Sequence, residues 1–279
     1  MIKDHTAVST MTQSDLPDIL QALQASGNNE TQFGEIWTQG RSAYGGLSGS
    51  IAAAAMGKEV DQEVPLRSLM VSFIGPIPPG TVSVPVKKQR VGKNVAQLSA
   101  EIVSDGSLCL QAMAAYGRPR EAIQVAPQEA FNPIPRDQGV PISKAKRFPS
   151  FLAYFDGCWA GGGIPFSGKP ERQVFLWAKH RCDMSAFPAE KIIAIADIPP
   201  PVLLSHFEGG PVPASSLSWS LEFVVPPNEI DSEWFYLEFT LEAAAEGYTQ
   251  QSGKIFTEDG VLCALSRQCM VYFGPTAST

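Results

Sequence analysis

The chain has 279 residues, of which 44% are hydrophobic and 18% are charged, and its formal net charge is −7. This composition is typical of a globular protein and excludes a largely disordered one, and the acidic balance argues against a nucleic-acid-binding protein. No apolar run approaches the ~20 residues of a membrane-spanning helix. The N-terminal sequence lacks the apolar core of a secretory signal, so we expect a cytoplasmic protein.

Residues 1–32 are polar and irregular, apart from a short helix expected at 15–25. A first α+β unit is expected from residue 33 to residue 120. Its central helix, at 43–56, is rich in alanine, a strong helix former whose small side chain lets a sheet pack closely around it. Strands are expected at residues 34–40, 66–75, 81–91, 95–103 and 108–117.

Residues 121–150 are rich in proline, glutamine and charge, and they are interpreted as a linker. A second unit is expected at 151–279. Its helix lies within 188–206, because three consecutive prolines at 199–201 cut the helical pattern short. Strands are expected at residues 173–182, 216–225, 234–244, 249–257 and 261–274.

The two units repeat each other. An offset of 150 residues places Ser68 and Phe73 on Ser218 and Phe223. An offset of 154 residues places the turn Asp105-Gly106 on Asp259-Gly260, and both turns separate two strand-like runs. Because these matches occur in the same strand order, the sequence predicts a duplicated α+β domain and not a solenoid.

Cysteine and histidine give no sign of a metal or redox centre. The five cysteines form no CxxC pair and the three histidines are scattered, so neither a metal nor another cofactor is expected. Positive charge is concentrated in two clusters that are able to bind an anion such as coenzyme A or to form solvated surface. The clusters are Lys87, Lys88, Arg90 and Lys93, and Lys144, Lys146 and Arg147.

Three segments resemble the acyl-CoA thioesterase II family. They are the sequence YGGLSG from Tyr44, the sequence VSFIGPIPPG from Val71, and the ending FTEDGVLCALSRQ up to Gln268. The resemblance covers roughly residues 33–120 and 150–274. It implies two tandem hot-dog domains, each an antiparallel sheet wrapped round a central helix, that together form a double hot-dog. It also implies an enzyme of fatty acid metabolism that hydrolyses acyl-CoA without a metal or a covalent intermediate.

The family site lies in the second domain and uses an Asp, a Thr or Ser, and a Gln to hold and activate one water. In this chain Gln268 stands at the position of the family's Gln. The family's Asp, in a Ser-Leu-Asp motif, corresponds to Ser218, and its Thr corresponds to Glu242. The resemblance therefore predicts a catalytic set of Gln268, Glu242 and Ser218, in which the carboxylate and the hydroxyl have exchanged strands.

In that set Gln268 would position the water and Glu242 would accept its proton, since burial raises the pKa of a carboxyl group. Two alternatives are that Glu242 is a solvated strand residue and that Gln268 only hydrogen-bonds a loop. Asp197, in the second helix, is another acid on a central element. It either caps the helix, faces solvent or takes part in catalysis.

Substrate binding is predicted at the start of the first central helix. The backbone N–H groups of Gly45 and Gly46 are able to face a thioester oxygen or a phosphate, and Tyr44 is able to line the acyl pocket. The alternatives are close helix–sheet packing by the glycines and core packing by Tyr44.

The leading hypothesis is an acyl-CoA thioesterase that releases free CoA and a carboxylic acid. A second hypothesis is a non-catalytic protein that binds acyl thioesters or lipids, and a third is an interaction module. A hot-dog hydratase would need a His near Asp156, and none is present. Acyl chain length and the homo-oligomeric state, for which exposed sheet edges offer a surface, are left open by the sequence.

Overall fold

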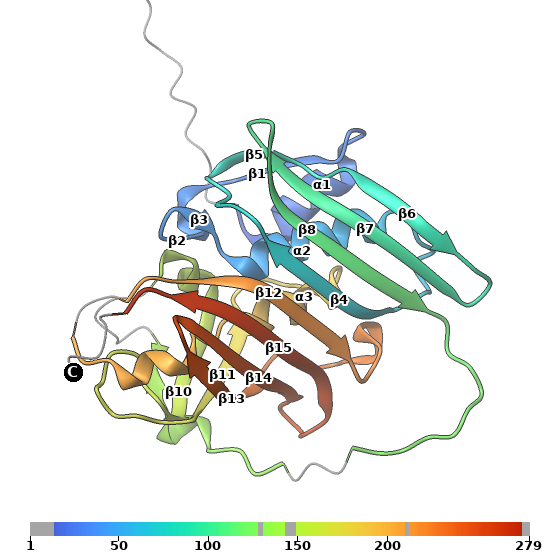
Figure 1. Ribbon diagram of the computed structural model, residues 1–279. Coiled ribbons are helices and arrows are strands. Elements are labelled where there is room, and N and C mark those ends of the chain that lie inside the picture. Colours follow the sequence, from blue (N-terminus) through green and yellow to red (C-terminus); the bar gives the residue numbers. More distant parts are fainter. Residues whose placement is uncertain (1–13, 128–130, 143–148, 210–211, 275–279) are drawn as a thin grey trace, which may run out of the picture.

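The structure is a computed structural model that describes residues 14–127, 131–142, 149–209 and 212–274. Within these residues thirteen strands form one antiparallel sheet that curls around two central helices, α2 Gly45–Gly57 and α3 Pro188–Ala196 (Figure 1). Each half of the sheet encloses one helix. This architecture confirms the predicted α+β class and the double hot-dog arrangement.

The two halves of the sheet repeat the same strand order outward from their junction. They meet where β4 pairs with β12, with Leu69 opposite Leu221. The first half consists of β4 Leu66–Phe73, β8 Ser107–Gly117, β7 Val95–Ser104, β5 Gly80–Ser83 and β1 Glu30–Phe33, with β6 Val86–Val91 also paired to β7. The second half consists of β12 Ala214–Phe223, β15 Leu262–Tyr272, β14 Tyr248–Thr257, β13 Phe235–Ala245, β11 Gln173–His180, β10 Phe155–Gly162 and β9 Val140–Pro141.

Smaller elements close the ends of the sheet. Helix α1 Leu16–Ala25 begins after Asp15, which forms a capping box with Asp18. Strands β2 Thr38–Gln39 and β3 Ser42–Ala43 pair with each other just before α2. Short 3-10 helices lie at η1 Glu35–Trp37, η2 Arg136–Gln138, η4 Ser150–Tyr154, η5 Val202–His206 and η6 Pro227–Glu229.

Helix α2 is buried on all sides. Every residue from Gly46 to Met56 is buried, and most of them are glycine, alanine or serine. A helix that is apolar all round requires a complete covering of protein. The small side chains allow both the sheet and α3 to approach the helix axis closely.

Helices α2 and α3 pack against each other in antiparallel orientation. The Tyr44 hydroxyl, at the start of α2, donates to the carbonyl of Ala194 near the end of α3 at 2.5 Å. The Ser50 hydroxyl, farther along α2, donates to the Gly46 carbonyl at 2.7 Å and also lies 3.3 Å from the carbonyl oxygen of Glu190 near the start of α3. The N-terminus of α2 therefore faces the C-terminus of α3.

The strand predictions need several corrections, and β1, β3 and β9 were not predicted at all. Residues 34–40 form η1 and β2 instead of one strand. The run 81–91 is two strands, β5 and β6, separated at Pro85, which has no N–H for the ladder. Strand β10 was not predicted, because Gly157, Gly161 and Gly162 make its sequence look like a loop.

The first basic cluster lies on and beside the exposed strand β6. Lys87, Lys88, Arg90 and Lys93 are all exposed, and Lys88 forms an ion pair with Glu59 at 2.9 Å. Charged side chains on such a strand hinder pairing with another sheet, which is a structural role. The second cluster, Lys144, Lys146 and Arg147, lies outside the described residues.

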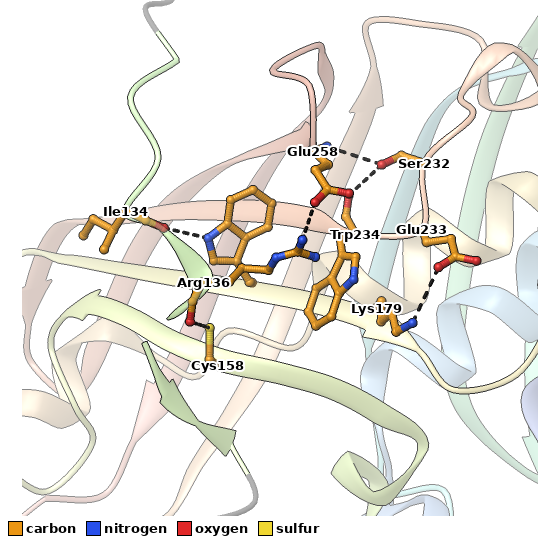
Figure 2. Close-up of polar contacts among 9 residues, drawn as sticks. Ile134, Arg136, Cys158, Lys179, Ser232, Glu233, Trp234 and Glu258 are labelled. Carbon is orange, nitrogen blue, oxygen red and sulfur yellow. Dashed lines mark hydrogen bonds and ion pairs between the residues drawn. The ribbon is translucent and has the colours of Figure 1, made fainter. Parts of the chain in front are cut away.

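The segment that connects the two halves is anchored on the outer side of the second half (Figure 2). The Arg136 guanidinium lies 4.4 Å from the Trp234 ring and 5.5 Å from the Trp177 ring, and it forms an ion pair with Glu258. The Trp177 indole N–H donates to the Ile134 carbonyl at 2.7 Å. These cation–π and polar contacts fix residues 134–136 to the sheet.

A test of the packing in the second half is Gly253→Ala on β14. A methyl group at this position would lie 2.4 Å from Cζ of Phe239, so the ring must move. We expect a loss of roughly 1–3 kcal/mol in the free energy of unfolding, measured by urea denaturation, as for other overpacked cores. Gly34→Ala is the matched control, because nothing lies within 4 Å of its added methyl group. Equal unfolding free energies for the two variants would contradict the packing.

Candidate active site

The site is built where the C-terminus of α3 meets the N-terminus of α2. Helix α3 ends at Asp197, its C-cap residue, and three prolines follow shortly after, at 199–201. The first turn of α2 has backbone N–H groups without partners inside the helix. One of them, the N–H of Gly46, donates to the Asp197 carboxylate. The N-terminus of α2 thus directs a hydrogen-bond donor and the positive end of the helix dipole toward the Asp197 carboxylate.

The glycine pair makes this approach sterically feasible. A methyl group on Gly45 would lie 2.6 Å from Oδ2 of Asp197, and one on Gly46 would lie 2.8 Å from the Ala194 carbonyl oxygen. The glycines therefore have the close-packing role that the sequence left open, and this packing brings the Gly46 N–H to the carboxylate. Their role toward a thioester oxygen or a phosphate stays a prediction. Any larger residue would push α3 and its acid away.

Tyr44 supports the site from within the core. It is fully buried, its ring stacks on Phe151 with centroids 3.7 Å apart, and its hydroxyl is bonded to Ala194. Burial, reinforced by the charge of Asp197, raises the pKa of Tyr44 well above its ordinary value. The hydroxyl therefore remains a donor that ties α2 to α3. This is the core-packing role that the sequence left open for Tyr44.

Gln268 on β15 reaches the same acid from the sheet. Its side chain faces the core and is 3% exposed. Its Nε2 donates to Oδ1 of Asp197 at 2.6 Å. The sequence singled out both residues, but no local pattern indicated that they meet, since 71 positions separate them.

Gln251 on β14 sets the orientation of the Gln268 amide. Oε1 of Gln251 accepts the backbone N–H of Val202 at 3.0 Å, and its Nε2 donates to Oε1 of Gln268 at 2.8 Å. Because an amide offers its oxygen on one side and its NH2 on the other, this chain turns the NH2 of Gln268 toward Asp197. Sequence reasoning missed Gln251. The only available signal was a polar residue at an inward position of a strand.

The environment of Asp197 makes it a base suited to neutral pH. Burial raises the pKa of Asp197 to about 7, even though the hydrogen bonds from Gln268 and Gly46 act to lower it. A carboxyl group with this pKa is half ionised near pH 7, which suits proton transfer. Perturbed carboxyl groups of this kind are concentrated at functional sites.

The structure does not bring Ser218 to this group. Strand β12 has a bulge between Ser216 and Ser218, so Ser216 pairs with Met270 while Ser218 pairs with Cys269. Met270 and Gln268 share the inner face of β15, which places Ser216 on the face of Gln268. Ser218 points to the outer, exposed face. On β12, the serine that shares the face of Gln268 is therefore Ser216, which sequence reasoning did not select.

Glu242 is also placed away from Gln268. It is exposed at a bulge of β13, and its carboxylate accepts a hydrogen bond from the hydroxyl of Ser252. Ser252 neighbours Gln251 on β14 and points to the opposite face. Glu242 is thus a solvated strand residue, which is the alternative that the sequence left open, and the acid beside Gln268 is Asp197.

No group of three or more metal-ligating side chains occurs among the described residues. In the same part of the chain, no helix has the length and apolar character that crossing a bilayer requires.

Comparisons with known proteins agree with this architecture. The acyl-CoA thioesterase N-terminal domain family matches residues 33–117, and the acyl-CoA thioesterase C-terminal domain family matches residues 127–272. A search of curated proteins found no significant match.

Solved structures with a similar fold share little sequence with the chain. A conserved protein of unknown function with a hot-dog fold from Alicyclobacillus acidocaldarius has a TM-score of 0.79 at 16% identity, over 88% of this chain and 93% of that one. The tesB protein of Mycobacterium avium subspecies paratuberculosis has a TM-score of 0.73 at 17% identity, over 93% and 100%. The acyl-CoA thioesterase II TesB2 of Mycobacterium marinum has a TM-score of 0.67 at 17% identity, over the same shares. With both of its domains matched in order, the chain belongs to the acyl-CoA thioesterase family.

Proposed function

We propose that this protein hydrolyses acyl-CoA to free CoA and a carboxylic acid, with Asp197 as the general base for a directly attacking water. The observation that carries the proposal is the hydrogen bond of 2.6 Å between Gln268 and Asp197, formed against the first turn of α2. It joins a carboxyl group titrating near neutral pH to an oriented amide and a helix N-terminus. Membership of the thioesterase family supports the same reaction.

In the proposed reaction Asp197 takes a proton from a water as the water oxygen attacks the thioester carbonyl. Gln268 holds the carboxylate in place, and the hydroxyl of Ser216, on the same face of the sheet, helps to orient the water. The tetrahedral intermediate then collapses with cleavage of the C–S bond. The thiolate of CoA leaves and receives the proton that Asp197 had accepted.

The developing oxyanion needs hydrogen-bond donors and positive charge. We propose that the backbone N–H of Gly45 and the positive end of the α2 dipole supply both, while the N–H of Gly46 is bonded to Asp197. A helix N-terminus provides free donors and the positive end of the helix dipole. Tyr44 contributes indirectly, by holding α2 and α3 together at this point.

The competing hypothesis of a non-catalytic acyl-thioester-binding protein depended on the loss of an acid at position 218. The position of Asp197 beside Gln268 weighs against that hypothesis, since a partly buried acid is present without Ser218 or Glu242. Release of free thiol from acyl-CoA distinguishes the two. Binding of acyl-CoA without thiol release would favour the non-catalytic protein.

We expect Asp197→Asn to reduce kcat for acyl-CoA hydrolysis by about 10²–10⁴-fold, because the amide cannot accept the proton of the water. We expect Gln268→Ala to reduce kcat by about 10²-fold, as for the loss of an oriented polar group in a buried site. Thiol release measured with a chromogenic thiol reagent checks both values.

The controls for these variants are Glu242→Gln and Ser218→Ala, which alter exposed residues on the outer face. Both should keep kcat within about twofold of the unmodified protein. Loss of activity in Glu242→Gln together with full activity in Asp197→Asn would contradict Asp197 as the base. It would instead support Glu242, the base inferred from the sequence.

The rate should also depend on pH through Asp197. Because only the ionised carboxylate acts as a base, kcat/KM should rise with pH around a midpoint near the Asp197 pKa of about 7. Replacing Gln268 by Leu removes a hydrogen bond that lowers this pKa, so the midpoint for the residual activity should move to higher pH. A rate that stays constant between about pH 5 and pH 9 would exclude Asp197 as the base.

A further inference from the structure

One bulky side chain fills the core directly beside the candidate active site. Trp219 on β12 is 2% exposed and pairs across the strands with Gln268 on one side and Val71 on the other. Its indole N–H donates to the hydroxyl of Ser266 at 2.9 Å. Ser266 lies two residues before Gln268 on β15, whereas Ser216 pairs with Met270, two residues after Gln268. The bond therefore holds the indole ring on the side of Gln268 that is opposite to Ser216.

The helix pair closes over the Trp219 ring. A methyl group built on Gly49 of α2 would lie 3.0 Å from Cζ3 of Trp219 and 3.2 Å from Cγ2 of Ile193 on α3. The absence of a side chain at Gly49 is therefore what gives the indole its place. Between the sheet and the helices, the indole and Ile193 leave no room at this level for even one added carbon atom.

The positions of Gly45 and Gly49 on α2 give the distance between the Asp197 carboxylate and the Trp219 indole along the helix. Gly45 adjoins Asp197 and Gly49 adjoins Trp219, and the two glycines are one helical turn apart on the same face of α2. Four residues of α-helix rise by about 6 Å. An acyl chain whose carbonyl carbon lies at Asp197 and which runs inward along α2 has space for only a few methylene groups before it meets the indole.

Side chains also fill two neighbouring directions. Toward β14 the space holds the hydrogen-bonded pair of Gln251 and Gln268, followed by the Phe239 ring over Gly253. Toward the start of α2 it holds Tyr44 stacked on Phe151. The indole thus fills the core along α2 at the level of Gly49.

We propose that Trp219 is the specificity-determining residue that ends the acyl-binding space, and that the substrates of this enzyme are short-chain acyl-CoA thioesters. This inference rests on the proposed function and specifies its substrate class. It depends on the position of Trp219 beside Gln268 and beneath Gly49. Removal of the indole should open the core along α2 and admit longer chains.

The test is the chain-length profile of the unmodified protein and of two variants, Trp219→Ala and Trp219→Phe. The panel contains acetyl-, butyryl-, hexanoyl-, octanoyl-, lauroyl- and palmitoyl-CoA, and kcat/KM is measured by thiol release. For the unmodified protein, kcat/KM with acetyl-, butyryl- and hexanoyl-CoA should exceed kcat/KM with palmitoyl-CoA by roughly 100-fold or more. The reason is that each methylene group the binding space excludes carries a substantial penalty. In Trp219→Ala the ratio of lauroyl- to butyryl-CoA activity should rise by roughly tenfold or more, with Trp219→Phe between the two.

A preference of the unmodified protein for lauroyl- or palmitoyl-CoA would overturn the inference while leaving the thioesterase proposal intact. So would a folded Trp219→Ala with an unchanged profile. If Trp219→Ala does not fold, the inference is tested by the chain-length profiles of the unmodified protein and of Trp219→Phe. If no acyl-CoA is cleaved, the proposed function fails, and calorimetric binding of the same panel decides the inference. Weaker binding beyond hexanoyl-CoA would then support it, and tight palmitoyl-CoA binding would refute it.

Discussion

The contact between the Asp197 carboxylate and the first turn of α2 is the constraint on which the rest of the site depends. It requires antiparallel central helices, since only then does the end of α3 face the start of α2. It requires Gly45 and Gly46, because any side chain there would meet Asp197, Tyr44 or Ala194 within 3 Å. It also explains the abrupt end of α3 before three prolines, which leaves the acid at the helix terminus. A duplicated fold supplies this arrangement because the two helices lie at its centre.

The electrostatic balance at Asp197 links the site to the stability of the protein. Burial raises the pKa to about 7, above the ordinary value of 3.8 that the unfolded chain retains. Between these two pH values the folded protein binds more protons than the unfolded chain, so this group makes stability fall as pH rises through that window. Glu190 on α3, whose pKa burial raises to about 7, acts with the same sign. Keeping such an acid in the core opposes folding at neutral pH, and a catalytic base is a functional reason for retaining it.

Much of the fold was predictable from the sequence. Which of the candidate site residues lie together was not. The repeat, the two central helices and most strands follow from patterns within a few residues, and the polar Gln268 on an apolar strand was a visible signal. The pairing of Gln268 with Asp197 is a contact between distant segments that no local pattern encodes. Simple alternation would place Ser216 and Ser218 on the same face, but the bulge at Leu217 places them on opposite faces. The family motif therefore selected Ser218, although Ser216 is the serine that faces inward. A second bulge, between Leu241 and Ala243, leaves Glu242 in solvent.

Titration of the Asp197 carboxyl carbon tests most directly whether the helix terminus and the sheet together hold one partly buried acid ready to accept a proton at neutral pH. Carbon-13 NMR of protein labelled at aspartate, with Asp197→Asn used to assign the resonance, gives the pKa of this group without any substrate. We expect a pKa of about 7 for this carboxyl group. A value at or below the ordinary 3.8 would mean that Asp197 is a solvated carboxylate, and it would contradict the account.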